Sequence, residues 1–237
     1  MHIADIDYIS TFGRSFFHKA RPISKVIFSI LLLFSMITTD SIYYILSIIG
    51  LMIVFTGLAR IPFKQMIHLL GYPLFFSIIF ALVFIGQSRE MMFLIMGRAV
   101  GAAYILVFLI MTTSYTELFG FFSLFMPTLL VDVFIFTYRS LFILLEATSK
   151  LFRSIKLRGG YHPLRIVMNM KNMASMIGVL IIHSLEMSER MYNIYSLRGY
   201  KGAVNLRRIT IWPLGWNDYF VLFAGLASVA WRFIIWK

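Results

Sequence analysis

The chain contains no cysteine among its 237 residues, which excludes thiolate metal sites and a catalytic cysteine. Acidic residues are also scarce, with 10 Asp and Glu against 22 Lys and Arg. The sequence has no Gly-x4-Gly-Lys-Ser/Thr phosphate loop, no His-Glu-x-x-His motif and no Gly-x-Ser-x-Gly motif. These absences argue against an ATPase, a zinc hydrolase and a serine hydrolase. We therefore expect no catalytic residue, no cofactor and no bound metal.

Apolar residues make up most of what is present. The chain is 60% hydrophobic and 17% aromatic, and its mean hydropathy is +0.84. Several apolar runs approach the roughly 20 residues that a helix needs to cross a bilayer, and they lack the alternation of a β-barrel. These runs cover residues 25–39, 42–59, 72–87, 91–113 and 216–236. We predict an all-α, polytopic membrane protein with about five transmembrane helices.

The distribution of charge predicts the orientation. Lys and Arg gather before the first apolar run, after the second, and throughout residues 150–171 and 190–208. The positive-inside rule assigns these segments to the cytoplasm, so the turns at residues 38–41 and 86–90 are expected outside. The prediction is a multi-pass protein of the cell (inner) membrane with a cytoplasmic N-terminus.

The chain is expected to have three parts. Residues 1–114 hold an N-terminal segment and the first four transmembrane helices, and residues 213–237 hold the last one. Residues 115–212 form a basic but apolar region, and a further full span within it would move the basic segments outside, against the charge rule. We therefore expect residues 115–212 to be cytoplasmic.

Within this region we expect one short helix and two long ones. Residues 118–126 form the short helix, which Pro127 ends because proline disfavours helix in the residue before it. Helices over about 129–158 and 164–198 would be on the order of 45 and 50 Å long. Both carry apolar stripes and basic ends.

A short motif occurs twice in the region, at the end of each long helix. Leu157-Arg158-Gly159-Gly160-Tyr161 and Leu197-Arg198-Gly199-Tyr200 are separated by 198 − 158 = 40 residues. In each copy a Glu precedes a cation by four residues, a spacing that supports a helix. These supporting pairs are Glu146 with Lys150 and Glu186 with Arg190. Each motif then has Arg in the last turn and Gly at the position that favours a left-handed cap.

Each copy alone is compatible with an ordinary helix C-terminus. Two copies with matched upstream residues on basic segments favour a binding role instead. Arginine carries a planar, permanently charged fork that can bind a carboxylate at two points. The expected partner surface is therefore an acidic groove on another protein.

The two signatures, the basic segment at residues 17–25 and the number of spans resemble the transmembrane T component of energy-coupling factor (ECF) type ABC transporters, the cobalt-transport Q-protein family. The resemblance covers essentially the whole chain. It implies a scaffold and energy-coupling subunit of an importer for a transition-metal ion or a vitamin. ATP would be hydrolysed by partner subunits, so this chain would not be an enzyme.

The same resemblance implies the partners. Two cytoplasmic ABC ATPase subunits would dock on the signatures, and a small substrate-binding membrane subunit would bind elsewhere within the lipid bilayer. The implied ATPase contacts are Leu157, Arg158, Gly159, Leu197, Arg198 and Gly199. The family usually has a small residue before each Arg, where this chain has Leu. Its N-terminal segment often reads Asp-Pro-Arg-x-Lys, where this chain has Ala20-Arg21-Pro22-Ile23-Ser24-Lys25 without the acidic residue.

A self-contained channel or secondary transporter is the alternative. Arg98 lies within the fourth apolar run, with Asp132 and Arg139 near the membrane face, and charged groups in spans often mark ion paths. The repeat, however, involves helix ends and not sets of spans. Binding of nucleic acid is not expected, because the positive-inside rule already explains the net charge of +12. The spacing Gly97-x3-Gly101 suits close helix packing, either between spans or against the substrate-binding subunit.

Overall fold

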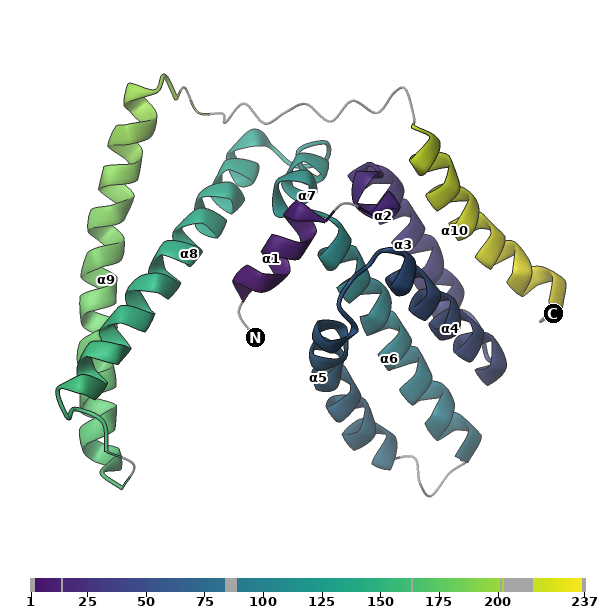
Figure 1. Ribbon diagram of the computed structural model, residues 1–237, viewed down its shortest axis with the longest axis horizontal. Helices are drawn as coiled ribbons and strands as arrows, with labels where there is room; N and C mark the ends of the chain where they lie inside the picture. The colour runs from purple at the N-terminus through teal and green to yellow at the C-terminus, as the bar shows by residue number, and fades with distance from the viewer. Residues whose placement is uncertain are drawn as a thin grey trace. The chain divides into compact units, whose positions relative to one another are not determined.

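The computed structural model describes residues 3–13, 15–83, 89–162, 164–200, 202 and 215–235, and within these all regular structure is helical. The all-α prediction is confirmed, and the protein is a polytopic membrane protein. Ten helices are labelled in Figure 1. Their bounds are α1 (Ile3–Phe12), α2 (Phe16–Lys19), α3 (Pro22–Ile37), α4 (Ile42–Leu58), α5 (Phe63–Leu82), α6 (Arg89–Thr112), α7 (Tyr115–Phe122), α8 (Thr128–Leu157), α9 (Ile166–Leu197) and α10 (Trp216–Ile235).

The chain forms two compact units. Met1–Phe121 and Ile209–Lys237 form one, here called the membrane unit, and Phe122–Arg208 form the other. In the membrane unit α6 packs against α3, α4 and α5, while α10 packs along α3. The last helix of the chain therefore belongs with the first ones.

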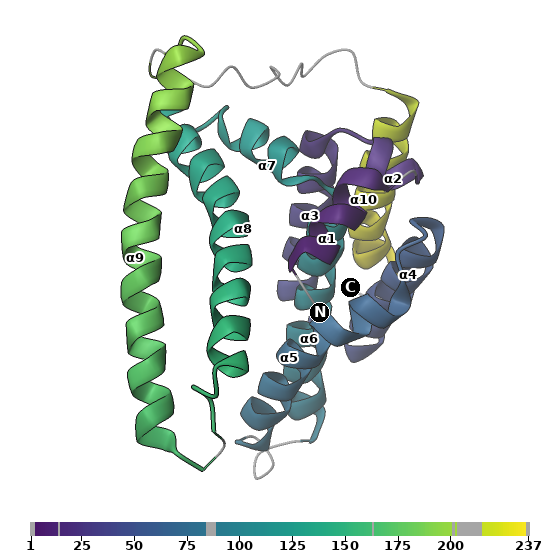
Figure 2. The same ribbon diagram turned by 60° about the vertical axis from the view of Figure 1, so that its left-hand side comes forward.

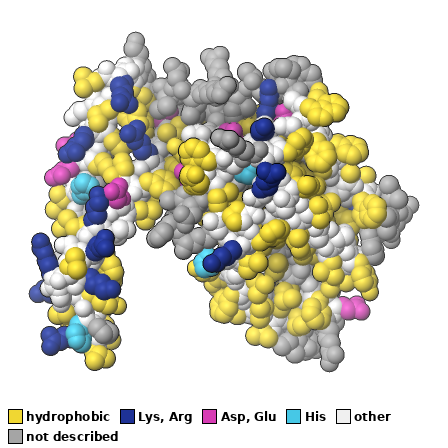
Figure 3. Space-filling view, in the orientation of Figure 1, with side chains coloured by type: hydrophobic (Ala, Val, Ile, Leu, Met, Phe, Trp, Pro, Cys, Tyr) yellow, Lys and Arg dark blue, Asp and Glu magenta, His cyan; other side chains and the backbone are white. Residues whose placement is uncertain are grey.

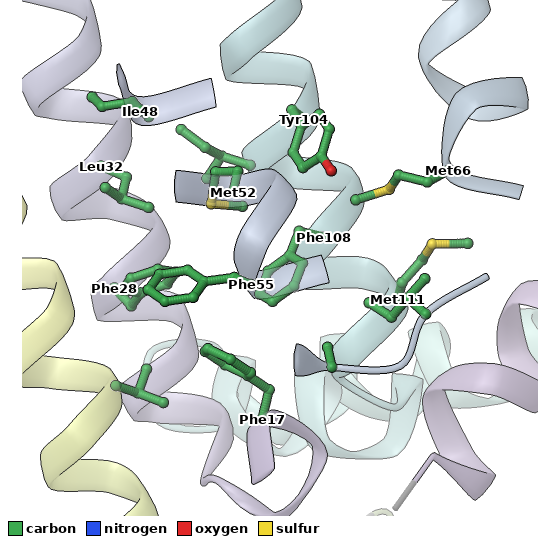
Figure 4. Packing of buried hydrophobic residues seen from close by; sticks show 14 of the residues in the cluster. Phe17, Phe28, Leu32, Ile48, Met52, Phe55, Met66, Tyr104, Phe108 and Met111 are labelled. Carbon is green, nitrogen blue, oxygen red and sulfur yellow. The ribbon is translucent and has the colours of Figure 1, made fainter. Parts of the chain in front are cut away.

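Aromatic rings and methionines fill the core of the membrane unit. The ring of Phe17 lies 5.1 Å from that of Phe55 and 5.3 Å from that of Phe108, and Phe28 lies 5.8 Å from Phe55. Figure 4 shows these rings beside Met52 and Met111. Phe17 comes from the short helix α2, so the segment before α3 is anchored in the core.

The ends of the apolar helices follow local sequence signals. Proline is at the first position of α3, where its fixed φ suits a helix and its missing N–H is not needed. The α5 helix begins at Phe63, nine residues before the predicted start at residue 72, and Pro73 lies inside it. The predicted end of that span, residues 84–87, lies outside the described residues.

Length divides the apolar helices into two groups. By length and composition α5, α6, α8 and α9 are each sufficient to cross a membrane, whereas α3 and α4 are shorter apolar helices of 16 and 17 residues. A helix of 16 residues is about 24 Å long, which is less than the bilayer core of about 30 Å. Length alone therefore does not separate the predicted spans from the long helices α8 and α9.

The second unit is dominated by α8 and α9, which run antiparallel and form the α8–α9 hairpin (Figures 1 and 2). They have 30 and 32 residues, and their bounds differ by no more than two residues from the predicted ones. The short helix before them spans Tyr115–Phe122 instead of residues 118–126. No residue of α9 is buried, and on α8 only Val131 and Asp132 are.

Candidate functional site: the two tips of the α8–α9 hairpin

The first signature closes α8 with a left-handed glycine. Arg158 is the C-cap residue, and Gly159 follows it with a φ of +72°. The amide of Gly159 donates to the carbonyl of Lys156 over 3.2 Å, and that of Gly160 donates to the carbonyl of Ile155 over 2.9 Å. This pair of bonds is the Schellman motif, which satisfies carbonyls left open at a helix C-terminus.

The second signature closes α9 in the same way. Gly199 follows the C-cap residue Arg198 with a φ of +79°. Its amide donates to the carbonyl of Ser196 over 3.0 Å, and the amide of Tyr200 donates to the carbonyl of Tyr195 over 2.9 Å. The two repeats thus share backbone conformation and hydrogen bonds as well as sequence.

Both tips are open to solvent. The leucines before the arginines are among the most exposed apolar residues described, with 81% of Leu157 and 89% of Leu197 accessible. Arg158 and Arg198 are also exposed. Each tip therefore presents one apolar side chain next to one permanent positive charge.

The antiparallel arrangement puts the tips at opposite ends of the hairpin. A helix of 30 residues, such as α8, is about 45 Å long. Arg158 and Arg198 are consequently separated by a distance of this order. The two tips are therefore separate surfaces of the hairpin.

Each tip is anchored on the beginning of the other helix. After the second tip, the Tyr200 hydroxyl donates to the Asp132 carboxylate of α8 over 2.7 Å. The same bond raises the pKa of the Tyr200 hydroxyl, because the carboxylate favours the protonated phenol. Nearby, Arg139 donates to the Tyr195 hydroxyl over 2.9 Å. The two charged residues considered for an ion path, Asp132 and Arg139, bind the α9 end of the hairpin here.

The first tip is held by two asparagines at the beginning of α9. Asn172 donates from its side chain to the carbonyl of Gly160. Asn169 accepts from the amide of His162 over 3.0 Å and donates to its carbonyl over 2.7 Å. These side chains fix the loop that follows the Arg158 cap.

The supporting pairs upstream of the tips differ. Lys150 and Glu146 form an exposed ion pair with 2.6 Å between Nζ and Oε1. Glu186 and Arg190, both described, form no ion pair with each other or with another described residue. The two copies of the repeat are therefore more alike in structure at the helix caps than along the helices.

The anchors of the tips are not evident from the sequence. Tyr200 stood inside the repeat, but its partner Asp132 is 68 positions away, so no local pattern linked them. Asn169 and Asn172 are one turn apart on α9, which was a signal for a shared helix face. Only the pairing of the two helices brings these groups to the tips.

The space between α8 and α9 is a shallow groove and not a metal site. One part has a volume of about 360 Å³ and is lined by apolar residues and hydroxyls, including Phe136, Ser140, Met187 and Tyr195. Among the described residues no group of three His, Asp or Glu side chains is arranged to hold a metal ion. Lys and Arg side chains lie along the whole length of the hairpin in Figure 3.

Comparison with known proteins identifies the relatives of this chain. The model of the cobalt transport protein (CbiQ) family matches residues 13–210. An uncharacterized protein of Methanocaldococcus jannaschii is 29% identical over 218 residues, with 81% of each chain covered. The family match includes the basic N-terminal segment, α3 to α9 and both tips.

Proposed function

We propose, since this chain belongs to the cobalt transport protein family, that it is the membrane scaffold and energy-coupling subunit of an ATP-driven ECF importer. One observation carries the proposal. Two helix ends with the same Leu-Arg-Gly sequence adopt the same cap and expose the same side chains. A pair of equivalent, charged tips suits a pair of equivalent partners.

The proposed partners at the tips are two cytoplasmic ABC ATPase subunits. The exposed guanidinium of each tip would bind a carboxylate in a groove of one subunit, and the adjacent leucine would contact the groove wall. The Schellman cap keeps the backbone rigid at this point, which lowers the entropy lost on binding. The separation of about 45 Å, from the length of α8, leaves room for one subunit at each tip.

A location of the α8–α9 hairpin along the cytoplasmic face of the membrane fits this role. If the hairpin crossed the bilayer, its antiparallel helices would carry Arg158 and Arg198 to opposite sides. Both ends of the hairpin are basic, which favours the cytoplasmic side for both. The exposed apolar residues of α9 would then lie against lipid or a partner.

In this scheme the chain performs no chemistry. ATP binding and hydrolysis by the partners would move the hairpin, and the movement would reorient a small substrate-binding membrane subunit. The transported substrate would be a transition-metal ion or a vitamin. Recognition of that substrate would lie in the partner subunit.

Reversal of charge at both tips tests the docking proposal. The double variant Arg158→Glu/Arg198→Glu should fail to retain the ATPases during purification in mild detergent, while its own helix content is unchanged. Arg165→Glu is the matched control, because Arg165 is an exposed arginine of the same hairpin outside the signatures. Retention of both ATPases by the double variant would refute the assignment.

A channel or secondary transporter is the second candidate, and the length of α8 and α9 favours it, since both are sufficient to cross a membrane. The chain has no cysteine, so single cysteines can be labelled without background. Lys156→Cys and Ser196→Cys report on the two ends of the hairpin. Labelling of both by an impermeant maleimide from the cytoplasmic side supports the coupling subunit, and labelling from opposite sides supports the channel.

A further inference from the structure

The side chain of Lys25 is buried near the beginning of α3, with only 3% of it exposed. Its ammonium donates to the backbone carbonyl of Thr112 over 2.7 Å and to that of His18 over 3.2 Å. A buried ammonium is costly unless it is paired and hydrogen-bonded. The protein therefore holds this charge at one defined position.

That position is the C-terminal end of α6. The carbonyls of its last residues have no partner within the helix, and a cation next to them is favourable. Lys25 binds the carbonyl of Thr112, and Nε2 of His18 lies 3.2 Å from the carbonyl oxygen of Met111. Two side chains from the segment before and within α3 thus cap α6.

Lys25 also pairs with the helix that follows. Its ammonium lies 3.7 Å from Oε2 of Glu117, in the first turn of α7. Between the two helices the chain bends at Thr113 and Ser114, which are both buried. Lys25 therefore contacts the chain on each side of this bend.

The bend lies where the membrane unit leads into the α8–α9 hairpin. The boundary between the two units falls at Phe121 and Phe122, at the end of α7. α7 is thus one of the two stretches of chain through which movement of the hairpin can reach the membrane helices. A stiff α6–α7 bend would transmit a force, whereas a loose one would absorb it.

We propose that Lys25 and Glu117 are positioning residues for energy coupling, which lock the bend between α6 and α7 so that hairpin movement is passed on to the membrane helices. The inference rests on the proposed function. This proposal gives the basic segment at residues 17–25 a structural role, because it contains both His18 and Lys25. His18 and Lys25 stiffen the α6 side of the bend, and Glu117 ties the α7 side to the same ammonium.

The variant Glu117→Gln tests the lock, because Glu117 is 41% exposed and its replacement leaves the buried groups of α6 paired. The complete complex in liposomes is supplied with ATP, and ATP hydrolysis and cobalt(II) uptake are measured together. The variant should retain its ATPases and their hydrolysis. Uptake per ATP should fall by at least about fivefold, the lower end of the usual range for coupling between sites.

Hydrogen exchange gives a readout that does not depend on the transported substrate. The amides of residues 115–122 should exchange faster in Glu117→Gln than in the original protein, while those of residues 150–160 at the first tip should not change. Glu90→Gln, which replaces an exposed acid at the other end of α6, is the matched control and should have neither effect. Lys25→Met removes the same ion pair from the other side.

The outcomes separate the two proposals. Failure of the original chain to retain ATPases would refute the proposed function, whatever the variants do. An original complex that transports, together with a Glu117→Gln complex of unchanged coupling and unchanged exchange at α7, would overturn the lock alone. If Lys25→Met does not assemble, Glu117→Gln decides the question.

Discussion

The guanidinium of Arg98, on α6, binds the carboxylate of Asp40 in the turn between α3 and α4, with 2.9 Å between Nη2 and Oδ1. The same nitrogen also donates to the carbonyl of Thr39. Arg98 was the residue within a predicted span that favoured an ion path. It binds a backbone carbonyl in the turn after α3 and an acid of its own chain, which is what a structural arginine does.

Replacement of Arg98 should therefore affect stability more than transport. We expect Arg98→Ala to lower the free energy of unfolding by about 1–3 kcal/mol, because the Thr39 carbonyl loses its donor. Asp40 is almost fully exposed, so Asp40→Asn should cost less than about 1 kcal/mol. Thermal unfolding in detergent measures both. If Arg98→Ala has normal stability but has lost uptake, the structural role is wrong and Arg98 acts in transport.

Glycine to alanine substitutions in the hairpin should change its stability in opposite directions, depending on the position. Alanine at Gly159 or Gly199 is strained by the positive φ, and we expect each to cost about 1 kcal/mol. Gly178 lies within α9, is exposed and has open space where a Cβ would lie, so Gly178→Ala should stabilise the helix by roughly 0.5–1 kcal/mol. Amide exchange of the two helices measures the difference. Equal effects at the three positions would contradict the cap geometry.

The hydrogen bond that anchors the second tip can be removed by a substitution that keeps the shape of the side chain. Tyr200→Phe deletes the hydroxyl that donates to Asp132 and keeps the ring. We expect the amides of residues 195–200 to exchange several-fold faster and the ATPases to be retained less firmly, because the tip loses its tie to α8. Tyr192→Phe, at an exposed position on α9, is the control. A loss of equal size in the control would show that the anchor is not specific.

Close packing of α6 depends on Gly101. A Cβ at this position would lie 1.9 Å from the Cε atom of Met36, a completely buried side chain of α3. We expect the overpacking in Gly101→Ala to lower the free energy of unfolding by about 1–3 kcal/mol. Each 1 kcal/mol should lower the midpoint of thermal unfolding by about 2–4 °C. Gly71→Ala on α5, where no atom lies within 4 Å, should not destabilise through a clash. An unaltered midpoint for Gly101→Ala would mean that Met36 can move aside.

This glycine also resolves an alternative that the sequence left open. Gly97 and Gly101 pack against Ile45 of α4 and Met36 of α3, within the same chain. The spacing predicted close approach correctly, because only the absence of a side chain matters for that. It contained no information on which helix approaches, since two spans of one chain and two spans of different chains present the same small residues.

The sequence by itself determined the helical class, the approximate positions of the apolar helices, and the bounds of both long helices to within two residues. Hydrophobic runs, proline positions and Arg-Gly caps act through neighbours within a few residues, so they can be found without knowledge of the fold. The tertiary structure decided what lies beside what: Tyr200 on Asp132, Asn172 on Gly160, and Lys25 between α6 and α7. These contacts join residues far apart in the chain, and their geometry arises only when helices pack.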